Sequence, residues 1–153
     1  METFVDKLRQ DYEHITFKRT GVASWSPEIG QVSYSGHGDE TSIWSILHEL
    51  GHALLGHRSY ESDINLLRKE AAAWEKAVSI ANKYDIVIGQ SHIQNCLDTY
   101  RDWLHKRSTC PTCGSHGVQQ SKALYCCLNC RGTWKVSSAR FCRPYRLKSA
   151  QTI

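Results

Sequence analysis

Residues 48–57 read HELGHALLGH and lie in a segment with the apolar period of a helix. Its apolar residues, spaced at three and four, are Ile43, Ile46, Leu47, Leu50, Ala53 and Leu54. This spacing predicts an amphipathic helix over residues 42–55, capped by Thr41 or Ser42 and ending near Gly56. His48 and His52 would lie one turn apart on one face, so both imidazoles can reach one metal ion.

Glu49, between these two histidines, has the position of a general base in zinc-dependent peptide hydrolysis. In that chemistry the zinc ion polarises the scissile carbonyl and acidifies a water, while the carboxylate takes the water's proton and passes it to the leaving amine. Residue frequencies alone give about 0.02 such HExxH patterns in a chain of this composition. The pattern therefore favours a zinc site, and a purely structural histidine pair is the alternative.

A catalytic zinc ion takes three protein ligands, so a third donor is needed. The candidates are His37, His57, Glu61, Asp63, Glu70 and Glu75. His57 lies about 140° further round the helix than His52, which predicts a place at the helix end or behind the ligands. Glu70 lies closer than Glu75 to the apolar stripe of a helix predicted over about residues 63–84, and is the better-buried carboxylate. Either a metal ion or a basic side chain would supply the partner it needs there.

HELGHALLGH at 48–57, followed by Glu70-Ala71-Ala72-Ala73-Trp74, resembles the gluzincin pattern of HExxH with a downstream ExxA(D), and most closely the ImmA/IrrE-type metallopeptidases. Many of these are associated with phage and mobile-element repressors. The resemblance implies zinc ligands His48, His52 and Glu70, with Glu49 as general base. Trp74 stands where the family often has an aspartate that supports a ligand histidine. The SprT-like proteases, which also join HExxH to a C-terminal zinc ribbon, are the neighbouring family, but their third ligand is usually a downstream histidine.

Two CxxC knuckles, at residues 110–113 and 127–130, are separated by 13 residues and predict a second metal site. The expected ligands of this structural zinc ion are Cys110, Cys113, Cys127 and Cys130. Cys126 competes with Cys127, and His116 is a substitute donor. The C-terminal segment lacks a sizeable apolar core, so it needs a bound metal ion to stabilise its fold. We therefore expect a zinc ribbon.

Charge divides the chain at Asp102, the last acidic residue. Residues 1–102 carry 10 Lys/Arg and 15 Asp/Glu, a net charge of −5, whereas residues 103–153 carry 9 Lys/Arg and no Asp or Glu, a net charge of +9. The basic residues are interleaved with Tyr125, Trp134, Phe141 and Tyr145. This combination suits phosphate contact and base stacking, so the sequence favours nucleic-acid binding, with DNA as the expected partner; a soluble basic tail and a surface for an acidic protein partner are the alternatives.

These patterns predict an α+β fold in two domains. Residues 1–107 would form a zincin-like metallopeptidase domain: a helix over 2–13, an antiparallel meander of strands at 15–18, 21–25 and 31–35, the HExxH helix and the ligand helix, with a further helix over about 91–106. Residues 108–153 would form the basic zinc ribbon. The strand at 31–35 would be the edge strand that pairs with an extended substrate.

The predicted function is zinc-dependent endoproteolysis of a protein substrate, with the ribbon aiding binding to DNA or to the substrate. The substrate implied by the resemblance is a DNA-associated regulator. The alternatives are a SprT-like protease acting on DNA-bound proteins, and a non-catalytic DNA- or protein-binding regulator. The N-terminal residues lack the pattern of a signal peptide and no apolar stretch is long enough to span a membrane, so we expect a cytoplasmic protein that makes no membrane contact.

Overall fold

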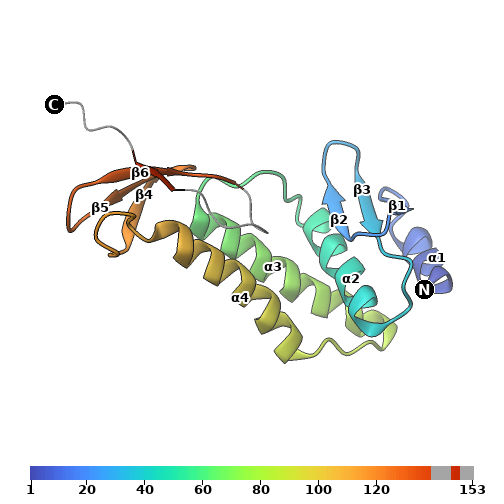
Figure 1. The fold of residues 1–153 in the computed structure, drawn as a ribbon. Helices are drawn as coiled ribbons and strands as arrows, with labels where there is room; N and C mark the ends of the chain where they lie inside the picture. Colours follow the sequence, from blue (N-terminus) through green and yellow to red (C-terminus); the bar gives the residue numbers. More distant parts are fainter. Residues whose placement is uncertain (139–145, 149–153) are drawn as a thin grey trace. The chain divides into compact units, whose positions relative to one another are not determined.

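The computed structural model describes residues 1–138 and 146–148 (Figure 1). The chain is α+β and divides into two compact units, one of residues 1–59 and 68–93 and the other of residues 60–67 and the chain from Gln94 onward. Residues 60–67 and 94–107, placed in the first domain by the sequence-based boundary, group with the ribbon. None of the helices in the described residues combines the length and apolar character needed to cross a membrane.

The first unit begins with helix α1, Glu2–Asp11, followed by a three-stranded sheet (Figure 1). Its strands are β1 (Thr16–Arg19), β2 (Ser24–Ser26) and β3 (Gln31–Tyr34). Their order is β1-β3-β2, with β1 parallel and β2 antiparallel to β3. The predicted antiparallel meander is therefore wrong, and so is the edge position expected for residues 31–35.

Burial explains why β3 is the central strand. Val32, Ser33 and Tyr34 are all buried, so both faces of β3 are covered, whereas no residue of β2 is buried. A strand with both faces covered is stabilised most in the middle of a sheet, between two partners. This leaves β2 as an edge strand, and β2 contacts the helix that follows the sheet.

That helix, α2, spans Glu40–Leu54 and carries the HExxH segment. Its N-cap is Asp39 and not Thr41 or Ser42, because the Asp39 carboxylate accepts a hydrogen bond of 2.8 Å from the Ser42 backbone N–H. After the helix ends, Gly56 adopts φ 63°, a left-handed conformation that glycine adopts without strain, and the His57 backbone N–H donates to the His52 backbone oxygen at 3.0 Å.

Helix α3 spans Asp63–Ala81, with a short 3-10 turn at Asn82–Tyr84, and α4 spans Gln90–Ser108. The buried face of α3 in the first unit consists of Glu70, Ala73, Trp74, Ala77, Ile80 and Ala81. The apolar spacing in this segment also includes Leu67, Ala71 and Val78, but these three residues are only half-buried. Glu70 therefore belongs to the buried face of the helix rather than to its border.

In the second unit, a four-stranded antiparallel sheet has the order β4-β5-β6-β7. Its strands are β4 (Gly117–Ser121), β5 (Leu124–Cys127), β6 (Thr133–Val136) and β7 (Arg146–Lys148). Tyr125 and Trp134 are cross-strand neighbours whose rings stack with centroids 5.6 Å apart. They form a small core with Val136, Cys110 and Cys127, beside the four-cysteine cluster.

Candidate metal centres

His48, His52 and Glu70 converge on one point in the first unit, although Glu70 follows His52 by 18 residues and lies on a different helix. The Nε2 atoms of His48 and His52 are 3.1 Å apart. Glu70 Oε2 lies 3.2 Å from His48 Nε2 and 3.6 Å from His52 Nε2. Donor atoms around a tetrahedral zinc ion with bonds of about 2.0–2.1 Å are separated by about 3.3 Å, so these spacings suit a metal ion.

The close approach of α2 to α3 depends on Gly51. A Cβ added at Gly51 would lie 2.5 Å from the backbone oxygen of Ala73, which no real side chain tolerates. Glycine therefore lets the two helix backbones meet beside His52 and Glu70. The sequence offered one signal of this role, a glycine inside a predicted helix, where glycine is otherwise unfavourable.

This group contains two buried polar atoms that make no well-formed hydrogen bond within the described part of the chain. His48 and Glu70 are 8% and 6% exposed, and neither His48 Nδ1 nor Glu70 Oε2 has a hydrogen-bond partner of good geometry among the described residues. Burial acts to raise the pKa of Glu70, but the adjoining imidazoles outweigh it and hold that pKa far below its usual value. A buried carboxylate that stays ionised between two imidazole nitrogens fits a bound cation, so the group could hold a metal ion.

The two histidines have different surroundings. The His48 ring stacks on Trp74, with centroids 4.3 Å apart and planes at 28°. His52 Nδ1 instead lies 2.9 Å from His57 Nδ1. His57 therefore lies at the helix end and next to a candidate ligand, as expected from the sequence, because the turn at Gly56 brings it back to His52.

Glu49 is half-buried and lies between His48 and His52 on α2. Burial raises the pKa of its carboxyl group and Glu70 adds to the rise, while the two histidines and a hydrogen bond with the Trp25 backbone oppose it. A carboxyl group with a raised pKa is a better proton acceptor near neutral pH.

The remaining candidates for the third ligand lie elsewhere. His37, Glu61 and Glu75 are exposed, and among the described residues none joins the histidine pair. Asp63 is buried in the second unit, where its Oδ2 lies 3.7 Å from Arg107 Nε and its backbone N–H donates to Gln119 Oε1 at 2.9 Å. No pattern in the sequence indicated this contact.

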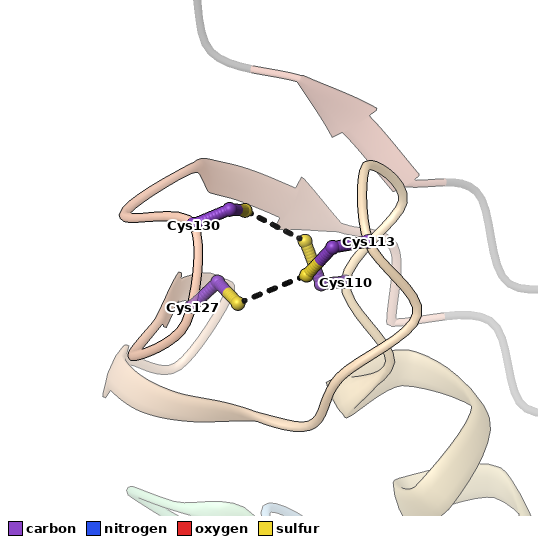
Figure 2. A group of neighbouring side chains, drawn as sticks. All are labelled: Cys110, Cys113, Cys127 and Cys130. Atoms are coloured by element: carbon purple, nitrogen blue, oxygen red, sulfur yellow. Dashed lines mark hydrogen bonds between the residues drawn. The ribbon is translucent and has the colours of Figure 1, made fainter.

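In the second unit, the thiols of Cys110, Cys113, Cys127 and Cys130 face one another (Figure 2). Cys110 Sγ lies 3.6 Å from Cys130 Sγ, and Cys113 Sγ lies 3.5 Å from Cys127 Sγ. The pKa of Cys113 is lowered to about 6, mainly by a hydrogen bond from the Ser115 backbone and then by one from the Ser115 side chain. Four cysteine sulfurs at these distances fit a tetrahedral ion such as zinc, which binds cysteine as the thiolate.

The competing donors stay outside this cluster. Cys126 and Cys127 are successive residues of β5, so their side chains point to opposite faces of the sheet. The Cys126 thiol contacts the backbone oxygen of Cys127 instead of the other thiols. His116 packs against His105, with ring centroids 4.3 Å apart. Cys142 lies outside the described residues.

The structure changes the picture of the basic surface. Tyr125 and Trp134 are 1% and 0% exposed, because both rings pack in the core of the ribbon. The expectation that they stack on nucleic-acid bases is therefore wrong. Arg107 is buried as well, whereas three other basic residues, Lys122, Arg131 and Lys135, are exposed. Other members of the predicted basic and aromatic set, namely Arg140, Phe141, Arg143 and Tyr145, lie outside the described residues, as do the side chains of Arg146 and Lys148.

The fold and the two clusters define an α+β protein with two candidate metal centres. No protein-family model, curated protein or solved structure matches the chain. Support for a function therefore comes from the chain's own side chains.

Proposed function

We propose that the chain is a zinc-dependent metalloendopeptidase that cleaves a protein substrate. The observation that carries this proposal is the convergence of His48 Nε2, His52 Nε2 and Glu70 Oε2 within 3.1–3.6 Å of one another. Two imidazoles and one carboxylate are the protein ligands of many catalytic zinc ions and leave one coordination position open.

Each residue of the group has a role in this proposal. His48, His52 and Glu70 would hold the ion, and a zinc ion bound there would supply Lewis-acid chemistry for peptide hydrolysis. Glu49 accepts a proton from the attacking water and delivers it to the leaving amine of the cleaved peptide bond. Its raised pKa suits both proton transfers. The ligand pair and the general base lie on one helix, so their relative positions are rigid.

The edge strand β2 is the proposed docking site for an extended stretch of substrate. It contacts α2, and the Trp25 backbone is hydrogen-bonded to Glu49, so the strand runs next to the general base. A strand with one unpaired edge binds an extended peptide through backbone hydrogen bonds. The sequence predicted that residues 31–35 would be the edge strand that binds substrate. Because these residues form the central strand β3, we assign substrate binding to β2.

We propose that the ribbon binds an acidic partner, DNA being the first candidate. Its exposed Lys122, Arg131 and Lys135 are accompanied by no acidic residue after Asp102. With Tyr125 and Trp134 buried, such binding rests on phosphate contacts in the described part of the ribbon. Together with the ImmA/IrrE resemblance, this favours a DNA-associated regulator as the substrate; a SprT-like role on other DNA-bound proteins is the second candidate, favoured by the ribbon.

The test of proteolysis is a comparison of wild-type protein with Glu49→Gln after incubation of each with a cell extract. Glu75→Gln is the control, because Glu75 is an exposed glutamate on α3. We expect new protein N-termini with the wild type and Glu75→Gln and none with Glu49→Gln, although all three retain both metal ions. Equal cleavage by Glu49→Gln would remove Glu49 from the mechanism, and cleavage by none would contradict the peptidase proposal.

The test of the ribbon is DNA affinity at several salt concentrations. We expect affinity to fall steeply with salt, and the Lys122→Gln/Lys135→Gln variant to show weaker binding and a shallower slope, because each lost phosphate contact lowers the slope by about 1. Lys7→Gln, an exposed change on α1, serves as the control. Absence of binding at low salt would favour an acidic protein partner over DNA.

A further inference from the structure

We infer that His57 is a positioning residue, which accepts a hydrogen bond from His52 Nδ1–H and thereby keeps His52 Nε2 free to bind the metal ion. The geometry behind this inference is the 2.9 Å separation between His52 Nδ1 and His57 Nδ1. The inference rests on the proposed metal centre and assigns a role to a residue that binds no ion itself.

Protonation states give the direction of this hydrogen bond. Two ring nitrogens at 2.9 Å need one proton between them, so one imidazole donates and the other accepts. A neutral His52 that binds a metal through Nε2 carries its only proton on Nδ1, and it must be the donor. His57 then accepts through Nδ1 and carries its own proton on Nε2.

The hydrogen bond requires the neutral form of His57. A protonated His57 would have hydrogens on both ring nitrogens and could not accept from His52.

The backbone around His57 is fixed at several points. The His57 N–H donates to the His52 backbone oxygen at 3.0 Å, and Trp25 Nε1 donates to the His57 backbone oxygen at 2.8 Å. Two residues later, the Ser59 backbone oxygen accepts a hydrogen bond of 2.6 Å from Lys69 Nζ. Lys69 directly precedes Glu70, so the same loop is tied to both ligand helices. Such fixed neighbours hold a ligand ring in its binding orientation.

His48 has no equivalent support. Its Nδ1 has no hydrogen-bond partner in the described part of the chain, and its ring is held by stacking on Trp74. Orientation of the histidine pair by hydrogen bonding therefore depends on His57. This asymmetry predicts that changes at His57 affect the metal centre through one ligand only.

The first experiment measures zinc affinity by competition with a chelator, in protein whose four-cysteine centre stays loaded. His57→Phe keeps a ring but removes the acceptor, whereas His57→Asn keeps an oxygen acceptor near the position of Nδ1. We expect His57→Phe to weaken zinc binding about 10- to 100-fold and His57→Asn to restore most of it. His14→Phe, an exposed histidine after α1, should bind as the wild type does.

The second experiment determines the histidine tautomers in the zinc-loaded wild type from ¹⁵N NMR. We expect His52 protonated at Nδ1 and His57 protonated at Nε2 only. Unchanged affinity in His57→Phe, or a proton on His57 Nδ1, would overturn the inference while the metal centre stands. If the wild type binds zinc at the four cysteines alone, the metal centre itself fails, and the two failures are thus distinguishable.

Discussion

Gly51 of α2 faces the backbone oxygen of Ala73 on α3 so closely that an added Cβ would lie 2.5 Å from that oxygen. This contact brings together the helix that carries His48 and His52 and the helix that carries Glu70. The arrangement of the candidate metal centre therefore depends on the absence of a side chain at Gly51 as well as on His48, His52 and Glu70.

Gly51→Ala should lower both stability and metal affinity. Alanine favours a helix over glycine by about 0.8–1.0 kcal/mol, but overpacking costs about 1–3 kcal/mol, and a backbone oxygen cannot move aside as a side chain can. We expect a net loss in the free energy of unfolding and weaker zinc binding, measured by thermal unfolding and chelator competition. Gly38→Ala is the control, since nothing lies within 4 Å of a Cβ there. Unchanged binding in Gly51→Ala would show that the helices separate without harm.

Cys113→Ser should unfold the ribbon sheet. The buried cluster beside the four thiols contains five residues, two of them cysteines, which is too little apolar burial to hold strands β4–β6 without a metal ion. We expect loss of one zinc ion and fast hydrogen exchange of the strand amides. Cys126→Ser should change neither, because the Cys126 thiol lies outside the cluster. Slow exchange in metal-free Cys113→Ser would contradict a structural role for the ion.

Asp63→Asn should destabilise the second unit. Arg107 is 2% exposed and its guanidinium lies 4.2 Å above the Trp103 ring, so loss of the Asp63 charge leaves a cation buried without its carboxylate. Removal of one partner from a buried ion pair costs about 3–5 kcal/mol. Adding Arg107→Met should recover part of that loss, as measured in a double-mutant cycle by denaturant unfolding. Additive losses would show that the two charges do not interact.

Local patterns in the sequence were enough to predict the helices, the histidine pair and the cysteine knuckles. Their evidence lies within a few residues: the three-and-four spacing around His48, and the CxxC pairs. Local patterns were not enough to identify Glu70 as the third candidate ligand. A carboxylate next to an apolar stripe can pair with a basic residue as readily as with a metal ion. The structure brings Glu70 to the histidines, in the middle of the buried face of α3.

Features that depend on packing between distant segments were not predictable from the sequence. β3 lies between β1 and β2 because both of its faces are covered, and no local pattern of residues 31–34 reveals which strands will flank them. Tyr125 and Trp134 are aromatic residues of the kind that stack on nucleic-acid bases. In the structure they are buried, because a small ribbon has few other side chains with which to fill its core. The Asp63–Arg107 contact joins positions 44 residues apart.

Zinc content per chain, in wild-type protein and in Glu70→Gln, tests the central claim most directly. Glu75→Gln, an exposed change on the same helix, is the control. If the His48, His52 and Glu70 group and the four cysteines each hold an ion, the wild type and Glu75→Gln bind two ions, and Glu70→Gln keeps only the thiolate-bound ion after mild chelation. One ion in the wild type, or two firmly held ions in Glu70→Gln, would contradict the three-ligand centre.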